Sequence, residues 1–133
     1  GPRGHFVIKM DSRRPVIFVA WDDGFAPVKS LIQHAMSLEM AETMDLYWIA
    51  DALPHYQDNL CRSWSDAMDN FHYHAMAASD GAERIVAAIL ADHADLAHFD
   101  LYAAGPAAFL DQLKRAALEH GLSPLGWHGE IVL

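Results

Sequence analysis

The fold is decided by residues 16–49, VIFVAWDDGFAPVKSLIQHAMSLEMAETMDLYWI. The first five and the last five residues of this stretch are short apolar runs rich in β-branched and aromatic side chains, which is typical of strands buried on both faces. Between them, apolar residues recur at steps of three and four from Val28 to Met40, and Pro27 suits the first turn of a helix. The stretch therefore predicts a strand–helix–strand unit with parallel strands and a right-handed crossover.

The remaining sequence continues this alternation of strands and helices. Further strands are predicted at residues 71–76, 100–104 and near 127–133, and further helices at 58–68, 82–90 and 107–120, the last ending before Gly121. Residues 6–9 also look like a strand, but no crossover helix follows them directly. The pattern predicts an α/β fold, a doubly wound, Rossmann-like sheet of five parallel strands with helices on both faces.

Composition limits the classes of function. The chain has 133 residues, 53% of them hydrophobic, which fits one globular domain. Its 18 acidic residues against nine Lys and Arg give a net charge of −9, which argues against nucleic acid as a partner. No uncharged run approaches the ~20 residues of a membrane span. One cysteine and an opening without a secretory leader favour a cytoplasmic, reducing location.

In a doubly wound sheet, ligands bind at the carboxyl ends of the strands. The segments to inspect are residues 21–27, 50–56, 76–81, 105–109 and the C-terminus. Gly24 and the pair Gly105-Pro106 each follow a strand and open a helix. Such a turn can seat a phosphate on a helix N-terminus, or it can be an ordinary tight connection, and the sequence leaves both interpretations open.

The acidic pair Asp22-Asp23 suggests a second kind of site. Paired acids after the first strand hold Mg²⁺ in response-regulator receiver domains. Asp80 could be the phosphate-accepting residue of such a domain, but no lysine follows Lys114, which lies within a predicted helix. A solvated acidic turn that caps the following helix is the better interpretation.

Histidine and cysteine give no clear catalytic or metal-binding pattern. His72 and His74 lie on the same side of a predicted strand, but zinc requires three or four ligands and no further set appears at a recognised spacing. Cys61 stands beside Arg62 without a histidine partner in any known catalytic spacing. We therefore predict neither catalytic residues nor a metal site.

Four segments of the chain resemble one known family. They are GPRGHF (1–6), PVIFVAWDDGFAPVKSLI (15–32), DLYWIA (45–50) and FDLYAAGPAAFLDQLKRAALEHGL (99–122). In this order they resemble the C-terminal pyridine-nucleotide domain of ferredoxin–NADP reductase-like proteins, in particular the NADH-dependent reductases that supply electrons to oxygenases. The resemblance implies a strand order of 3-2-1-4-5. It also implies that residues 1–10 end a preceding flavin-binding barrel and that residues 11–133 form the nucleotide-binding-like domain.

The chain departs from the family at three places that carry recognition. The family has a Gly-Gly-Thr-Gly-like turn after its first strand, whereas residues 21–24 here are Trp-Asp-Asp-Gly. Two carboxylates near a diphosphate repel it by roughly 1 kcal/mol even in water. The arginine that often follows the second strand is absent from residues 49–52, and Ala104 replaces the cysteine of the family's Cys-Gly-Pro turn.

Two hypotheses follow from the resemblance. In the first, the chain is the pyridine-nucleotide domain of a flavin-dependent oxidoreductase that passes hydride from NADH to FAD on the preceding domain. A 2Fe-2S cluster elsewhere and an electron acceptor such as an oxygenase component are further expectations. In the second, the domain keeps the fold but has lost the nucleotide and serves as a structural or docking module in a redox complex.

The resemblance also implies the residues that would contact NADH, with binding weakened or lost by the altered turn. Absence of a cation near Asp51 favours NADH over NADPH, whose 2′-phosphate needs one. The implied cofactor-binding residues are Asp23, Gly24, Phe25, Ala26, Pro27, Asp51, Ala104, Gly105 and Pro106.

Overall fold

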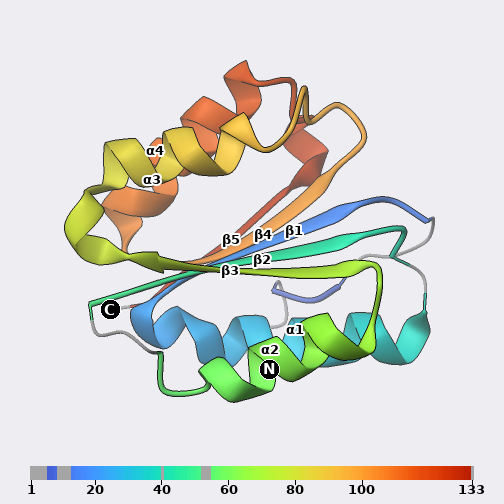
Figure 1. Cartoon of the computed structure of the whole chain (residues 1–133). Coiled ribbons are helices and arrows are strands. Elements are labelled where there is room, and N and C mark those ends of the chain that lie inside the picture. The colour runs from blue at the N-terminus through green and yellow to red at the C-terminus, as the bar shows by residue number, and fades with distance from the viewer. Residues whose placement is uncertain (1–5, 9–12, 40, 52–54, 133) are drawn as a thin grey trace.

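A computed structural model describes residues 6–8, 13–39, 41–51 and 55–132, and it consists of one sheet between two layers of helices (Figure 1). The strands are β1 (Val16–Trp21), β2 (Met44–Ala50), β3 (Phe71–Ala77), β4 (Asp100–Gly105) and β5 (Trp127–Ile131). The helices are α1 (Phe25–Leu38), α2 (Asp58–Ala67), α3 (Ala82–Ala91) and α4 (Ala107–Glu119), with 3₁₀ turns η1 (Asp22–Gly24), η2 (Ala78–Asp80) and η3 (Pro124–Gly126). All five strands pair in parallel in the order β3-β2-β1-β4-β5, so the predicted fold class and strand order are confirmed.

The central strand β1 pairs with β2 on one side and with β4 on the other. Val19, for example, lies opposite Tyr47 of β2 and opposite Ala103 of β4. Both β1 and β4 are buried from end to end except for Trp21, which is half-buried. A strand covered on both faces needs apolar residues at successive positions, which explains why these segments read as continuous apolar runs.

The two faces of the sheet have different packing layers. Helices α1 and α2 cover one face and α3 and α4 cover the other (Figure 1). The α1 and α2 layer is rich in aromatic rings: Phe18, Phe25, Trp48, Phe71 and Tyr102. The α3 and α4 layer is mainly aliphatic: Ile17, Val19, Ile49, Ile85, Val86, Ile89, Leu101, Leu110 and Leu113. Alternate residues of each strand supply the two layers, as the period of two requires.

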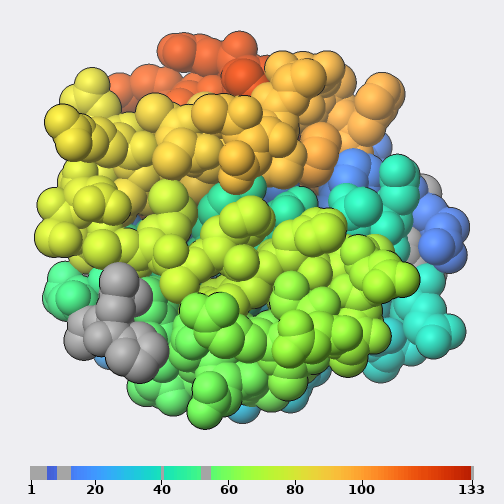
Figure 2. Space-filling model, viewed as in Figure 1, coloured from blue at the N-terminus to red at the C-terminus, as the bar shows by residue number. Residues whose placement is uncertain are grey.

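The edge strand β3 is open to the surface. Figure 2 shows its residues as a continuous strip between α3 above and α2 below. His72 and Ala75 are exposed, whereas Phe71 is buried beneath the α2 layer. Among the described residues, none of the helices has the length and apolar character of a membrane span.

Several predicted element ends differ from the structure. Residues 6–8 form bends and coil, so the strand predicted at 6–9 is wrong over its described part, and Phe6 and Ile8 instead pack against the aromatic layer. Helix α1 ends at Leu38 because Glu39 adopts a left-handed conformation with φ of 53°. Gly121, with φ of 100°, ends α4 as predicted. Of the expected barrel segment at residues 1–10, only residues 6–8 lie within the described part.

Candidate functional site

The carboxyl ends of the five strands lie together at the edge of the sheet from which α1, α3 and α4 begin (Figure 1). After β1, η1 leads directly into α1: the backbone N–H of Phe25 donates to the carbonyls of Asp22 and Asp23. After β4, Pro106 is the N-cap of α4, and its carbonyl accepts from the N–H of Leu110. Both turns therefore place the start of a helix at this edge.

Two glycines bring these turns into direct contact. A Cβ atom on Gly24 would lie 2.8 Å from the carbonyl carbon of Ala104, closer than real atoms approach. A Cβ on Gly105 would lie 2.8 Å from the Cβ of Trp21. The turn after β1 and the turn after β4 are thus held together by two small residues. This contact brings three of the implied site residues together: Gly24, Ala104 and Gly105.

Asp22 has a backbone conformation that favours glycine. Its φ is 53°, in the left-handed region, which aspartate tolerates better than most residues. The indole N–H of the fully buried Trp48 donates to the carbonyl of Asp22 over 3.1 Å and fixes the turn from below. The altered turn therefore keeps a glycine-like backbone while presenting carboxylates to solvent.

An aromatic cluster lies beneath this turn. The rings of Phe25 and Trp48 stack at 3.9 Å between centroids and 9° between planes. Tyr56 meets both rings edge-on, at 6.2 Å from Phe25 and 4.9 Å from Trp48, yet it remains 63% exposed. His55 is buried, and its Nε2–H donates to the carbonyl of Trp48 over 2.7 Å. Tyr56 is thus a rigidly supported aromatic ring with an open side.

The charge of this edge is negative where β1, β2 and β3 end. Asp22, Asp23, Asp51 and Asp80 are all exposed and follow these strands. Asp22 and Asp23 stand in the first turn of η1, where their charges already compensate the positive end of the helix dipole. Burial raises the pKa of Tyr56, and the nearby charges of Asp23 and Asp22 raise it further.

One cation lies close to the end of β3. Arg84 of α3 lines a hollow of about 320 Å³ together with Met76 and Asp80. Sequence reasoning did not identify this arginine, because it stands four residues after the turn rather than in it. Tyr56 was missed as well; an aromatic residue after β2 was a signal, but its contacts with Phe25 and Trp48 appear only in three dimensions.

The other implied residues lie in the segments that follow β1, β2 and β4. Ala26 is exposed and Pro27 is half-buried in the first turn of α1, and Pro106 is exposed at the start of α4. Asp51 is exposed directly after β2, and residues 52–54 lie outside the described part. The Asp23 carbonyl accepts from the backbone N–H of Phe25, and the Asp23 side chain is exposed. These five residues line the same edge of the sheet.

The candidate residues for metal or nucleophilic chemistry lie elsewhere. His74 stacks on Tyr47 at 4.3 Å and pairs with Asp45 at 3.3 Å, while His72 is exposed. No group of three or more His, Cys, Asp or Glu side chains suited to a metal ion occurs in the described residues. Burial raises the pKa of the Cys61 thiol to about 12, which keeps it protonated at neutral pH.

This parallel sheet with its paired helix-opening turns defines an α/β domain of the Rossmann-like class. "Protein RfbI" of Salmonella typhimurium is 33% identical over 129 residues, which cover 92% of this chain and 39% of that protein. The CDP-6-deoxy-L-threo-D-glycero-4-hexulose-3-dehydrase reductase of Yersinia pestis is 30% identical with the same coverage. The structure of a cytochrome P450 reductase of Amycolatopsis superposes on 89% of this chain with a TM-score of 0.77 and 15% sequence identity. The match covers 37% of that protein, and at this identity it shows a shared fold.

The chain belongs to the ferredoxin reductase-like family and matches the C-terminal NAD-binding region of its relatives. It spans about two fifths of the length of the first of these curated relatives. No protein-family profile matches it.

Proposed function

We propose that this chain is the pyridine-nucleotide domain of a flavin-dependent reductase and that it binds NADH at the carboxyl edge of its sheet. The observation that carries the proposal is the close contact of Gly24 with Ala104, which joins the helix-opening turns of β1 and β4. Names of relatives support it, since they include a hexulose-dehydrase reductase and flavin reductases.

Each part of this edge has a role in the proposal. Backbone N–H groups at the start of η1 and α1, around Asp23, Gly24 and Ala26, would receive the diphosphate. Asp51 would accept hydrogen bonds from ribose hydroxyls. Ala104 and Gly105, which carry no bulky side chain, would leave room for the nicotinamide. Phe25 and Pro27 fix the direction of α1, and Pro106 fixes that of α4. NADH, when bound, supplies the hydride.

The backbone fits a dinucleotide better than the charges do. Gly24 and the glycine-like Asp22 keep the turn compact, but the carboxylates of Asp22 and Asp23 stand where a diphosphate would approach. Repulsion between such charges is on the order of 1 kcal/mol each when they are exposed. We therefore propose weak binding of NADH, with no gain for NADPH.

The rest of the proposal concerns the longer protein. FAD would bind on a preceding barrel domain whose last part is residues 1–10, and the domain described here would be residues 11–133. An oxygenase component would accept the electrons, as the names of two terephthalate dioxygenase reductase components suggest for those relatives. A 2Fe-2S cluster in the longer protein and a cytoplasmic location complete the proposal.

Calorimetric titration of the chain with NADH and with NADPH tests the nucleotide site. We expect saturable, weak binding of NADH and no tighter binding of NADPH. The double variant Asp22→Asn with Asp23→Asn should bind NADH about tenfold more tightly, because it removes two charges near the diphosphate.

The matched control is Asp66→Asn with Asp69→Asn, which removes the same charge from the exposed far end of α2. It should leave NADH affinity unchanged at 0.15 M salt, where charges beyond ~8 Å are screened. If neither the parent nor the Asp22→Asn, Asp23→Asn variant binds NADH at millimolar concentration, the domain has lost the nucleotide and a docking role replaces the proposal.

A further inference from the structure

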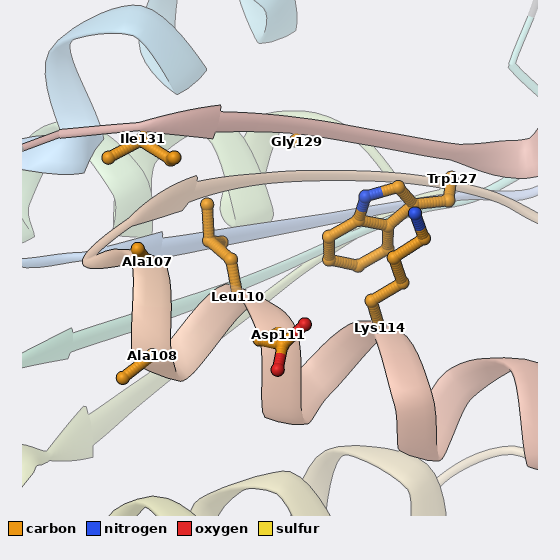
Figure 3. Close-up of a pocket in the computed structure, with 8 residues that line it drawn as sticks. All are labelled: Ala107, Ala108, Leu110, Asp111, Lys114, Trp127, Gly129 and Ile131. Atoms are coloured by element: carbon orange, nitrogen blue, oxygen red, sulfur yellow. The ribbon is translucent and has the colours of Figure 1, made fainter.

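A hollow on the described surface begins beside the turn after β4 and extends along α4. It is a groove of about 530 Å³ between α4 and the edge strand β5 (Figure 3). One end lies at Ala107 and Ile131, beside the turn that follows β4, and the other end lies at Lys114 and Trp127. Along α4 these ends are separated by about 10 Å, two helical turns. The volume is within the range of small-molecule sites.

A glycine sets the shape of the Trp127 end. The indole lies over Gly129, where a Cβ would stand 3.1 Å from the ring atoms Cζ2 and Nε1. A larger residue at this position would force the ring to shift. Figure 3 looks onto the broad face of this half-buried indole, which lines the groove. The groove thus has a flat aromatic wall.

The wall at the other end of the groove is apolar. Leu110 points from α4 toward the strand, and Ile131 of β5, which is 58% exposed, lies beyond it (Figure 3). Ala107 and Ala108 add only methyl groups. A ring system stacked on the indole would therefore continue along apolar surface rather than meet another polar group.

The groove carries a positive charge in an acidic chain. Lys114 extends from α4 toward the indole (Figure 3), and its ammonium forms no ion pair with any residue that the structure describes. Asp111 also lines the groove, but its carboxylate pairs with Arg115 at 2.9 Å. The charges of Lys114, Asp111 and Arg115 sum to +1, whereas the whole chain carries −9. The local charge thus favours an anion.

We propose that this groove binds a flat aromatic monoanion, an aryl carboxylate. Its ring stacks on the indole of Trp127, and its carboxylate accepts a hydrogen bond from the Lys114 ammonium. A stacked ring and a charge-assisted hydrogen bond are additive contacts of modest size, so a single-ring ligand binds weakly and a fused-ring ligand binds more tightly. The two contacts proposed for it, Trp127 and Lys114, lie at the end of the groove away from the turns.

The probe is 2-naphthoate, titrated into the ¹⁵N-labelled chain and followed by NMR. We expect shifts at the indole N–H of Trp127 and at the amides of Gly129 and Lys114. The uncharged 2-naphthamide should bind about tenfold more weakly, since it loses the charge-assisted contact. Trp127→Phe assigns the indole signal and should retain part of the affinity, because it retains a ring.

Lys114→Met should weaken 2-naphthoate about tenfold and leave 2-naphthamide unchanged. Lys29→Met, a lysine on α1 across the sheet, is the matched control and should change neither. Gly129→Val should block both probes by displacing the indole. The proposal fails if 2-naphthoate shifts Gly24 and Gly105 instead, if Lys114→Met binds it as well as the parent does, or if no binding occurs at millimolar concentration. NADH affinity is measured for the same variants, so that a failure of this proposal can be distinguished from a failure of the proposed nucleotide site.

Discussion

The turns after β1 and β4 pack against each other but have diverged to different extents from the family they resemble. The turn after β4 keeps Gly105-Pro106, and a Cβ at Gly105 would meet the Cβ of Trp21. The turn after β1 keeps only Gly24, while Trp21, Asp22 and Asp23 replace small residues. The residues that are kept are those whose Cβ would collide with a neighbouring strand or turn. Of the residues that changed, Asp22 and Asp23 are exposed, whereas Trp21 is half-buried and its Cβ borders Gly105.

This difference separates what the fold requires from what the ligand requires. Gly24 has φ of −59°, so any residue could adopt its backbone, and only the approach of Ala104 demands glycine. Asp22 has φ of 53° with an exposed side chain, so aspartate meets the backbone demand and leaves the chemistry of the surface free to change. The following experiments test this separation.

The largest effect is expected at Gly24. Gly24→Ala should lower the free energy of unfolding by about 3 kcal/mol, because the new Cβ overlaps backbone atoms of Ala104 that belong to a central strand. Gly81→Ala is the matched control: its space is open, but its φ is 88°. The control should lose about 1 kcal/mol from conformation alone. Urea unfolding of both variants gives the comparison, and equal losses would show that close approach is not what selects Gly24.

A smaller loss is expected at the residue that supports the acidic turn. Trp48→Phe removes the indole N–H that donates to the carbonyl of Asp22 and leaves a smaller ring against Phe25. The free energy of unfolding should fall by about 2 kcal/mol. Trp64→Phe, a half-buried tryptophan in the same layer, should lose about half as much. A loss at position 48 no larger than that at position 64 would contradict a supporting role for the hydrogen bond.

Restoring the family's turn tests the chemistry directly. The triple variant Trp21→Gly, Asp22→Gly, Asp23→Thr should bind NADH about tenfold more tightly, a change of about 1.4 kcal/mol. The gain should shrink as salt rises from 0.05 to 0.5 M, since screening weakens the charge term. Calorimetry at both salt concentrations measures it. A folded triple variant without improved affinity would show that the obstacle lies outside this turn.

The smallest effect concerns Tyr56. Its pKa is raised by burial and by the charges of Asp23 and Asp22. Asp22→Asn with Asp23→Asn should lower this pKa toward the ordinary value without reaching it, because a neutral turn no longer opposes the tyrosinate while burial still does. Ultraviolet titration of the phenol, with Tyr56→Phe to assign the transition, measures the shift. An unchanged pKa in the double variant would place the acids too far away to act on a ligand at this edge.

The fold was largely predictable from sequence, whereas the contacts of the site were not. Buried strands such as β1 and β4 must be apolar throughout, so their pattern is strong and local. The left-handed backbone conformations of Asp22, at the start of η1, and of Glu39, at the end of α1, were not predicted because neither residue is glycine. The strand predicted at residues 6–9 was wrong over residues 6–8, because a short apolar run indicates contact with the core, which Phe6 and Ile8 make, and does not by itself indicate strand pairing.

The parts of the site that sequence missed depend on residues far apart in the chain. Trp48 reaches the turn at Asp22 from the neighbouring strand, and Tyr56 rests on Phe25 from a different element. The groove at Lys114 forms only when α4 covers β5. No spacing in a single sequence encodes such distances. Gly24 and Gly105 could be named as candidates from the sequence, but the contacts that they permit could not be predicted from it.

The position of β1 in the middle of the sheet has a consequence for how the chain folds. Val16 of β1 pairs with Met44 on one side and with Asp100 on the other, about three times as far along the chain. Closing the longer loop costs on the order of 1 kcal/mol more in chain entropy. The first strand–helix–strand unit can therefore assemble early, while one edge of β1 waits for a partner. During synthesis, that apolar edge stays unpaired until β4 has left the ribosome, and it is the point at which premature association with another chain would begin.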